Sequence, residues 1–220
     1  MQAAYYTPKM ATELELKFST LADDFPSAPE LKSAFSGSGF GLGQPGLEIH
    51  RDRYFDDAVN SLRASGLALR RRTVEDKVNG NRVLATLKSA GNVSGAAHER
   101  EELEVLLTGY TWPPDIFERV APITDPHLLR VKLELATERR SYPVERDGKV
   151  IAMLAFDAVE AKYVSAAQSV TFSEAEIEAV GKTSLAELEA VAAIVDRAVH
   201  LTPNSANKVE RAEALLSLSL

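Results

Sequence analysis

The sequence predicts an α+β fold in which short antiparallel strands form a barrel or a sandwich, with a few helices beside it. Successive segments alternate polar and apolar residues with period two, which is typical of half-buried strands. Two dipeptides, Asn79-Gly80 and Asp147-Gly148, are typical of tight hairpin turns. The regular strand–helix alternation of a parallel sheet does not occur, because the helical patterns are few and two of them close the chain.

The expected elements follow from these patterns in chain order. The strands are expected at residues 11–18, 47–56, 67–74, 82–89, 98–107, 128–137, 140–146, 149–159 and 170–180. Helices or helical turns are expected at residues 26–35, 57–64, 111–121, 185–200 and 205–218, and loops at 36–46 and 91–97. There is no internal repeat, so we expect a single domain over residues 11–220, preceded by an N-terminal extension of residues 1–10.

The composition excludes several classes of function. The chain has no cysteine, which removes disulfides, cysteine-ligated zinc and thiol catalysis. With 25 Lys+Arg against 32 Asp+Glu, the net charge is −7, so a broad basic face for nucleic acid is not expected. No apolar run is long enough to span a membrane, and the first residues do not form a signal peptide. We therefore expect a cytoplasmic protein that binds neither nucleic acid nor membrane.

The expected strands share an unusual feature, because one face of each is charged. These faces are Glu13/Glu15/Lys17, Arg70/Arg72, Lys88, Arg100/Glu102/Glu104, Arg130/Lys132/Glu134 and Glu174/Glu176/Glu178. Charged side chains on a solvent-facing sheet are the ordinary explanation for any single strand. Like charges two residues apart repel, however, unless a group of opposite charge lies between them. Paired carboxylates suit a hard divalent cation, and paired arginines suit phosphate.

Two arrangements are therefore open from the residues alone. Either the charged faces point to solvent, or the sheet closes around a polar interior. A barrel of about eight strands has room for one small ligand. Unpaired charge inside a barrel costs several kcal/mol, so the second arrangement needs both signs of charge together with a ligand or a metal.

An ordered set of motifs resembles the CYTH proteins, also called triphosphate tunnel metalloenzymes. The set begins with Glu13-Leu14-Glu15-Leu16-Lys17, which matches the ExExK signature of that family. It continues through Tyr54-Phe55-Asp56, Leu69-Arg70-Arg71-Arg72, Thr86-Leu87-Lys88, Arg100-Glu101-Glu102-Leu103-Glu104, Arg139, Asp157, Glu174-Ala175-Glu176-Ile177-Glu178 and Asn207-Lys208-Val209-Glu210-Arg211. The resemblance spans residues 12 to about 216. The chain departs from the usual pattern at Ala175, Asn207 and Ala212, and the register at Arg139/Arg140 is open by one residue.

The resemblance implies a closed eight-stranded antiparallel β-barrel, or tunnel, with a charged interior and flanking helices. It implies that basic residues hold a small triphosphate substrate: Lys17, Arg70, Arg72, Lys88, Arg139 and Lys208. It implies that acidic residues hold Mg²⁺ or Mn²⁺, with Glu13, Glu15, Glu176 and Glu178 as first choices and Glu102, Glu104, Asp157 and Glu174 next. Lys88 and Lys208 are the candidates for a catalytic group near the attacked or leaving oxygen. A monomer or a homodimer is expected.

Several activities remain open within this resemblance. Hydrolysis of inorganic triphosphate is the first expectation, and thiamine triphosphatase or class IV adenylate cyclase activity is the alternative. A module that binds polyphosphate or a nucleotide without cleaving it is the alternative outside enzymes. The four histidines show no metal-ligand spacing, so we expect them to be structural or surface residues. Trp112 is expected to be a packing anchor.

Overall fold

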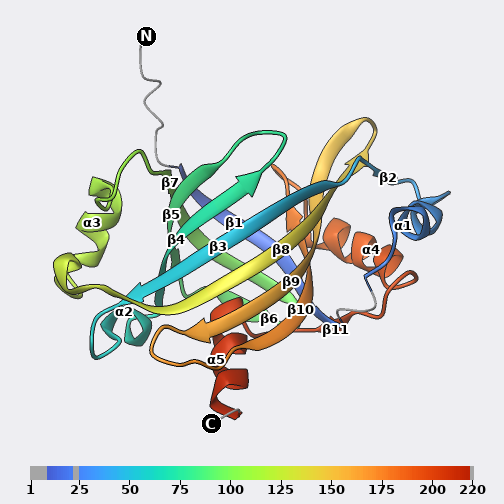
Figure 1. Cartoon of the computed structure of the whole chain (residues 1–220). Coiled ribbons are helices and arrows are strands. Elements are labelled where there is room, and N and C mark those ends of the chain that lie inside the picture. Colours follow the sequence, from blue (N-terminus) through green and yellow to red (C-terminus); the bar gives the residue numbers. More distant parts are fainter. Residues whose placement is uncertain (1–8, 22–24, 219–220) are drawn as a thin grey trace.

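Eight strands close into a barrel in the computed structural model, which describes residues 9–21 and 25–218 (Figure 1). The barrel strands are β1 (Lys9–Thr20), β3 (Gly46–Asp56), β4 (Leu67–Asp76), β5 (Arg82–Ser89), β7 (Ala97–Leu106), β8 (Arg130–Arg146), β9 (Lys149–Tyr163) and β10 (Val170–Ala179). They pair in the order β1-β10-β9-β8-β3-β4-β5-β7, and a further β1–β7 pairing closes the ring. Every pairing in the ring is antiparallel. The predicted closed eight-stranded antiparallel barrel is confirmed.

The N-terminal extension expected at residues 1–10 lies outside the described residues, except for its last two. Lys9 and Met10 already belong to β1, where they pair with Glu104 and Leu103 of β7.

The strand boundaries follow the alternation closely, with one clear difference. The segments expected at 128–137 and 140–146 form one continuous strand, β8, because Glu138 and Arg139 continue the ladder opposite Ala158 and Asp157 of β9. The β8–β9 hairpin turns at Asp147 and Gly148, which both have positive φ angles, as an Asn-Gly or Asp-Gly type I′ turn requires. Three short strands fall in segments where no strand was expected: β2 (Gly41–Leu42), β6 (Asn92–Ser94) and β11 (Thr202–Pro203).

Helices flank the barrel where helical patterns were expected. They are α1 (Ala28–Phe35), α2 (Ser61–Ala64), α3 (Pro114–Val120), α4 (Leu185–Val195) and α5 (Lys208–Leu218), with a 3₁₀ turn at Pro126–Leu128. The helix α4 ends five residues earlier than expected, because Asp196 caps it and its side chain accepts a hydrogen bond from the backbone of Leu201. The helix α5 starts three residues later than expected. Its start is fixed by reciprocal hydrogen bonds between Asn207 and Glu210, each side chain accepting from the other's backbone N–H.

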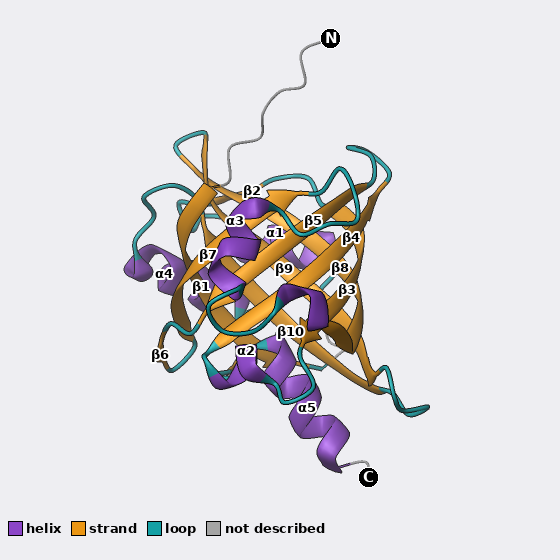
Figure 2. Ribbon diagram, turned by 90° about the vertical axis from the view of Figure 1, so that its left-hand side faces the viewer, coloured by secondary structure: helices purple, strands orange, loops and turns teal. Residues whose placement is uncertain are grey.

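Apolar strand faces pack outward against the helices, and this leaves the charged faces inside. One cluster joins α1 and α4 to the outer faces of β1, β9 and β10, through residues such as Leu16, Phe156 and Leu188. A second cluster joins α2 and α3 to β4, β5 and β7. A third cluster differs, because it lies on the inner face of β8, where Leu133 and Leu135 pack with Ala212 and Leu216 of α5. In both views α2 and α5 lie at the same end of the barrel (Figures 1 and 2).

Candidate functional site

A cavity of about 730 Å³ lies inside the barrel and is lined mainly by charged side chains. Its charged lining includes Glu13, Glu15, Lys17, Arg70, Arg72, Lys88, Arg100, Glu102, Glu104, Arg139, Glu176, Glu178 and Lys208. These residues come from β1, β4, β5, β7, β8, β10 and α5, so segments distant in sequence converge on one space. The charged faces of these strands therefore point inward, and the outward alternative is excluded for them.

One strand departs from this pattern, and the expectation for its charged face was wrong. On β8 the run Arg130, Lys132 and Glu134 does not face the interior as a set, because Leu133 and Leu135 occupy the inner face and pack near α5. Glu134 instead forms ion pairs on the outer surface, and only Lys132 reaches the rim of the cavity. Arg139 lies an even number of positions from Leu133 and Leu135, so its side chain points to the same inner face.

Arginines of β4 line one side of the cavity and share a buried carboxylate, Asp52 of β3. Arg72 binds Asp52 through two parallel hydrogen bonds, Nε to Oδ1 at 2.7 Å and Nη2 to Oδ2 at 2.6 Å. Arg70 lies farther away, with Nη1 3.7 Å from Asp52 Oδ2. Burial would raise the pKa of Asp52, but the charges of Arg72 and Arg70 outweigh it and hold that pKa well below its usual range. The two hydrogen bonds fix the orientation of the Arg72 guanidinium.

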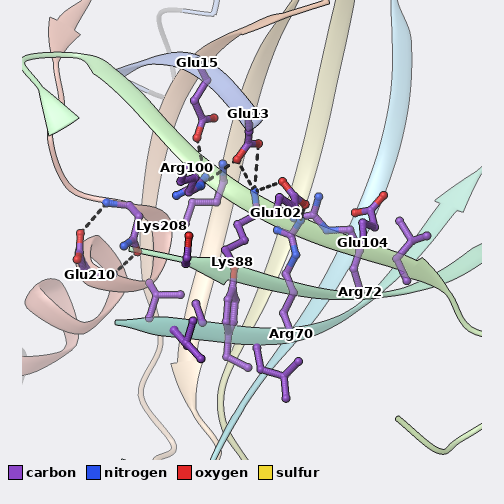
Figure 3. Close-up of a pocket in the computed structure, with 18 of the residues that line it drawn as sticks. Glu13, Glu15, Arg70, Arg72, Lys88, Arg100, Glu102, Glu104, Lys208 and Glu210 are labelled. Carbon is purple, nitrogen blue, oxygen red and sulfur yellow. Dashed lines mark hydrogen bonds and ion pairs between the residues drawn. The ribbon is translucent and has the colours of Figure 1, made fainter. Parts of the chain in front are cut away.

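A second charged network connects β1, β5 and β7 (Figure 3). Lys88 Nζ lies 3.0 Å from Glu13 Oε2 and 2.9 Å from Glu102 Oε2. Arg100 binds Glu13 through Nε at 2.9 Å and Glu15 through Nη2 at 2.6 Å. Burial opposes ionisation of Glu13, but Lys88 and Arg100 lower its pKa in spite of it. The network therefore keeps Glu13 ionised.

Three carboxylates, Asp157, Glu174 and Glu176, form a buried triad on β9 and β10, with ligand oxygens within 4.8 Å of one another. Lys208 of α5 places its ammonium among them, 2.9 Å from Asp157 Oδ2, 2.7 Å from Glu176 Oε1 and in contact with Glu174. Arg139 binds both Asp157 and Glu176, and Lys17 Nζ lies 2.5 Å from Glu176 Oε1. Side-chain cations thus occupy the centre of the triad, and Asp157 and Glu174 do not reach the cavity surface.

Glu178 differs from every carboxylate described above. It lines the cavity, yet its carboxylate makes no hydrogen bond or ion pair with any residue in the described part of the chain. In the β1–β10 ladder it lies directly opposite Glu15, a like-charged pair. Burial, together with the charges of Glu13 and Glu15, raises the pKa of Glu178 to about 7. This part of the cavity therefore carries more negative charge than its own cations compensate.

Among the residues predicted from the sequence, the structure brings all of the basic set and most of the acidic set onto one cavity, and their roles stay predictions. The sequence pattern placed Arg100 on a charged face but gave it no role, and it did not single out Asp52, although both residues lie inside. It also missed the pair Glu48 and His50 on β3. The signal was present for three of them, because Glu48, His50 and Asp52 occupy alternate positions of the expected strand.

Trp112 packs as expected, edge-on to Phe55 with ring centroids 4.9 Å apart. His50 and His98 are buried, whereas His127 and His200 are exposed. Among the described residues, no helix is both long and apolar enough to cross a membrane.

Comparison with known proteins addresses the fold and the family. The solved structures that resemble the chain include an adenylate cyclase candidate from Bacillus halodurans, with 18% identity, a TM-score of 0.56, and 92% of this chain and 98% of that one covered. A protein from Pyrococcus horikoshii has 19% identity and a TM-score of 0.55, with 94% and 99% covered. An adenylyl cyclase candidate from Hippeastrum, described as having a dominant triphosphatase activity, has 17% identity and a TM-score of 0.61, with 92% and 95% covered. At these identities they show the shared fold. No curated protein matches the sequence. The CYTH domain model matches residues 11–212, nearly the whole chain, and the chain therefore belongs to the CYTH domain family.

Proposed function

We propose that the protein is a divalent-metal-dependent hydrolase of a small triphosphate, with inorganic triphosphate as its first substrate. The observation that carries the proposal is the division of charge within one enclosed cavity. Arginines and lysines are directed at its interior, and beside them lies a group of carboxylates with too few cations. Cleavage of a phosphoanhydride bond depends mainly on charge neutralisation and positioning, and both are present here.

The basic residues of the cavity are the proposed triphosphate-binding groups. In the structure each is held by a carboxylate, as Arg72 is by Asp52 and Lys88 is by Glu13 and Glu102. A triphosphate would share these cations, and their orientation costs little further conformational entropy because it is already fixed. Lys88 is the first candidate for the group nearest the reacting oxygens. Lys208 is the second candidate, and it ranks below Lys88 because its ammonium already pairs with carboxylates of the triad.

The chemistry of the remaining carboxylates fits a hard divalent cation such as Mg²⁺ or Mn²⁺. Glu178 has no cationic partner among the described residues and lies opposite Glu15. We propose that Glu13, Glu15 and Glu178 hold the ion, with Glu102 and Glu104 nearby. When bound, such an ion neutralises charge on the phosphates and makes water more acidic. The triad of Asp157, Glu174 and Glu176 is a weaker candidate while Lys208 lies among its oxygens.

The lining of the cavity favours a compact substrate over one with a base or a thiazole ring. Tyr54 and Phe55 are aromatic residues of the lining, but Phe55 is engaged with Trp112 outside the barrel, and Tyr54 packs against the apolar cluster beneath α5. Neither offers a free aromatic face on which a base could stack.

The test is phosphate release from tripolyphosphate, thiamine triphosphate and ATP with Mg²⁺ or Mn²⁺, with cyclic AMP assayed in the ATP reactions. We expect tripolyphosphate to give the highest kcat/KM and chelation by EDTA to abolish it. Release from thiamine triphosphate or formation of cyclic AMP as the main activity would replace the substrate assignment. Binding of tripolyphosphate without turnover of any substrate would identify a binding module.

A further inference from the structure

The Glu48–His50 pair on β3 has no part in the networks described above. His50 is only 3% exposed and lines the cavity. Its Nε2 lies 2.7 Å from Glu48 Oε2, whereas its Nδ1 is buried without a hydrogen-bond partner. Hydrogen bonding to His50 lowers the pKa of Glu48 to about 2, so Glu48 is ionised at neutral pH and accepts the Nε2 proton. Nδ1 is therefore the free position of the ring, and a buried polar atom without a partner calls for one.

Glu48 is itself held in place, which fixes the orientation of the imidazole. Arg82 of β5 binds Glu48 Oε1 through Nη2 at 2.7 Å, and its Nη1 lies 3.5 Å from Asp76 Oδ2. Nε2 of the imidazole thus faces a fixed carboxylate, and Nδ1 has no hydrogen-bond partner.

His50 lies between two guanidinium groups proposed to bind phosphate. In the ladders of β3, its neighbour Glu48 pairs with Arg139 of β8, and its neighbour Asp52 pairs with Arg72 of β4. Both arginines line the same cavity and act electrostatically on His50. An anion held by Arg72 and Arg139 would therefore come close to the imidazole.

We propose that His50 is a proton-coupled phosphate-binding residue, which takes up one proton when a triphosphate enters the cavity and donates an Nδ1–H hydrogen bond to a phosphate oxygen. The proposal rests on the proposed function for the identity of the anion. It does not depend on hydrolysis. The proton comes from solvent, and Nε2 keeps its own proton and its bond to Glu48.

The charges around His50 explain why the proton would arrive with the anion. Burial lowers the pKa of His50, and Arg72 and Arg139 lower it further, against the opposing effects of Glu48 and Asp52. A bound triphosphate cancels the field of the two arginines and adds negative charge of its own, so it raises that pKa. Binding is then strengthened below the pKa of the complex, and this strengthening is lost as the pH rises through it.

The direct test is NMR titration of the protein labelled with ¹³C at histidine Cε1, with and without tripolyphosphate and in the absence of metal. The chain has four histidines, and His50→Gln identifies the signal of His50. We expect its midpoint below the ordinary histidine value in the free protein and at a clearly higher pH in the complex. His98, His127 and His200 do not line the cavity, so their signals provide internal references that move little.

A second experiment measures the affinity for tripolyphosphate at pH 6.5 and at pH 8.5. His50→Gln should weaken binding about tenfold at pH 6.5 and less than about twofold at pH 8.5, because only the charged hydrogen bond is lost. The matched control is His98→Gln, a buried histidine bonded to the backbone of Asn204, which should change neither affinity. An unchanged His50 midpoint in the complex, or an equal loss of affinity at both pH values, would overturn the proposal.

The two proposals fail in different ways. If tripolyphosphate binds with a shifted His50 midpoint but is not hydrolysed with metal, only the enzyme assignment is lost. If it is hydrolysed and the His50 midpoint stays where it was, only the proton coupling is lost. If it does not bind at all, both are lost.

Discussion

The carboxylates inside the barrel fall into two groups, which differ in how far neighbouring cations balance their charge. The triad of Asp157, Glu174 and Glu176 is paired with cations of the protein, since Lys208, Arg139 and Lys17 lie directly against it. The cavity carboxylates, Glu13, Glu15, Glu102, Glu104 and Glu178, line the cavity, and two of them, Glu104 and Glu178, form no ion pair among the described residues. Carboxylates whose charge is balanced by neighbouring cations stabilise the folded protein, whereas carboxylates whose charge is not balanced can bind a cationic ligand. The first group is therefore expected to matter for stability and the second for activity.

The largest effect should come from the cavity carboxylates. Changing Glu13 and Glu15 together to Gln removes two proposed metal ligands and should lower kcat for tripolyphosphate by at least about 100-fold. Metal-free binding should persist or strengthen, because Lys88 and Arg100 lose the carboxylates that hold them. Steady-state phosphate release and calorimetric binding measure the two quantities. Undiminished turnover would refute the metal assignment.

The triad should respond in stability instead. Lys208→Met leaves three buried carboxylates without their central cation and should cost about 3–5 kcal/mol in the free energy of unfolding. Lys88→Met removes the same charge from a residue at the cavity surface and should cost only about 1 kcal/mol. Urea denaturation of both variants at pH 7 compares them. Equal losses would mean that the two groups are energetically alike.

Glu178 sets the expected pH dependence of the metal-free protein. Its pKa in the folded state is about 7, above the usual value of 4.5, so the folded state binds more protons than the unfolded state between these values. Stability should therefore fall as the pH rises from about 5 to 8, and because Glu178 is exposed to solvent the fall should stay well below about 3 kcal/mol. Glu178→Gln should remove this part of the decrease. In wild type, millimolar Mg²⁺ should restore stability at pH 8, and the absence of any restoration would count against a metal at Glu178.

The smallest effect should distinguish inner from outer arginines. Arg72→Lys keeps the charge but loses the two-point grip on Asp52, and should raise KM about tenfold with a small change in kcat. Arg53→Lys is the matched control, because it makes the same substitution in an exposed ion pair with Glu134, and it should leave KM unchanged. If both variants behave alike in a kinetic assay, the inward direction of the charged face has no consequence for substrate binding.

Period-two patterning was enough to predict the strands, because each strand has one apolar face that packs against helices and one charged face that does not. It could not show which way the charge points, since both arrangements bury the same apolar residues. For β8 it was misleading, because Leu133 and Leu135 turn inward to meet α5, a contact invisible from the local sequence. Asp52 escaped notice because a lone acid beside surface arginines looks like an exposed residue. Its pairing with Arg72 depends on the β3–β4 register.

The placement of the charges also bears on how the chain reaches its fold. Closing the barrel brings together groups as distant as Lys17 and Glu176, 159 residues apart, and such long-range pairing slows folding. A charged lumen cannot drive collapse, because its groups gain nothing from leaving water before their partners arrive. The apolar clusters under α1, α4, α2 and α3 are therefore the ones that must assemble the wall from outside. The surface that makes the protein fold and the surface that would give it an activity are opposite faces of the same strands.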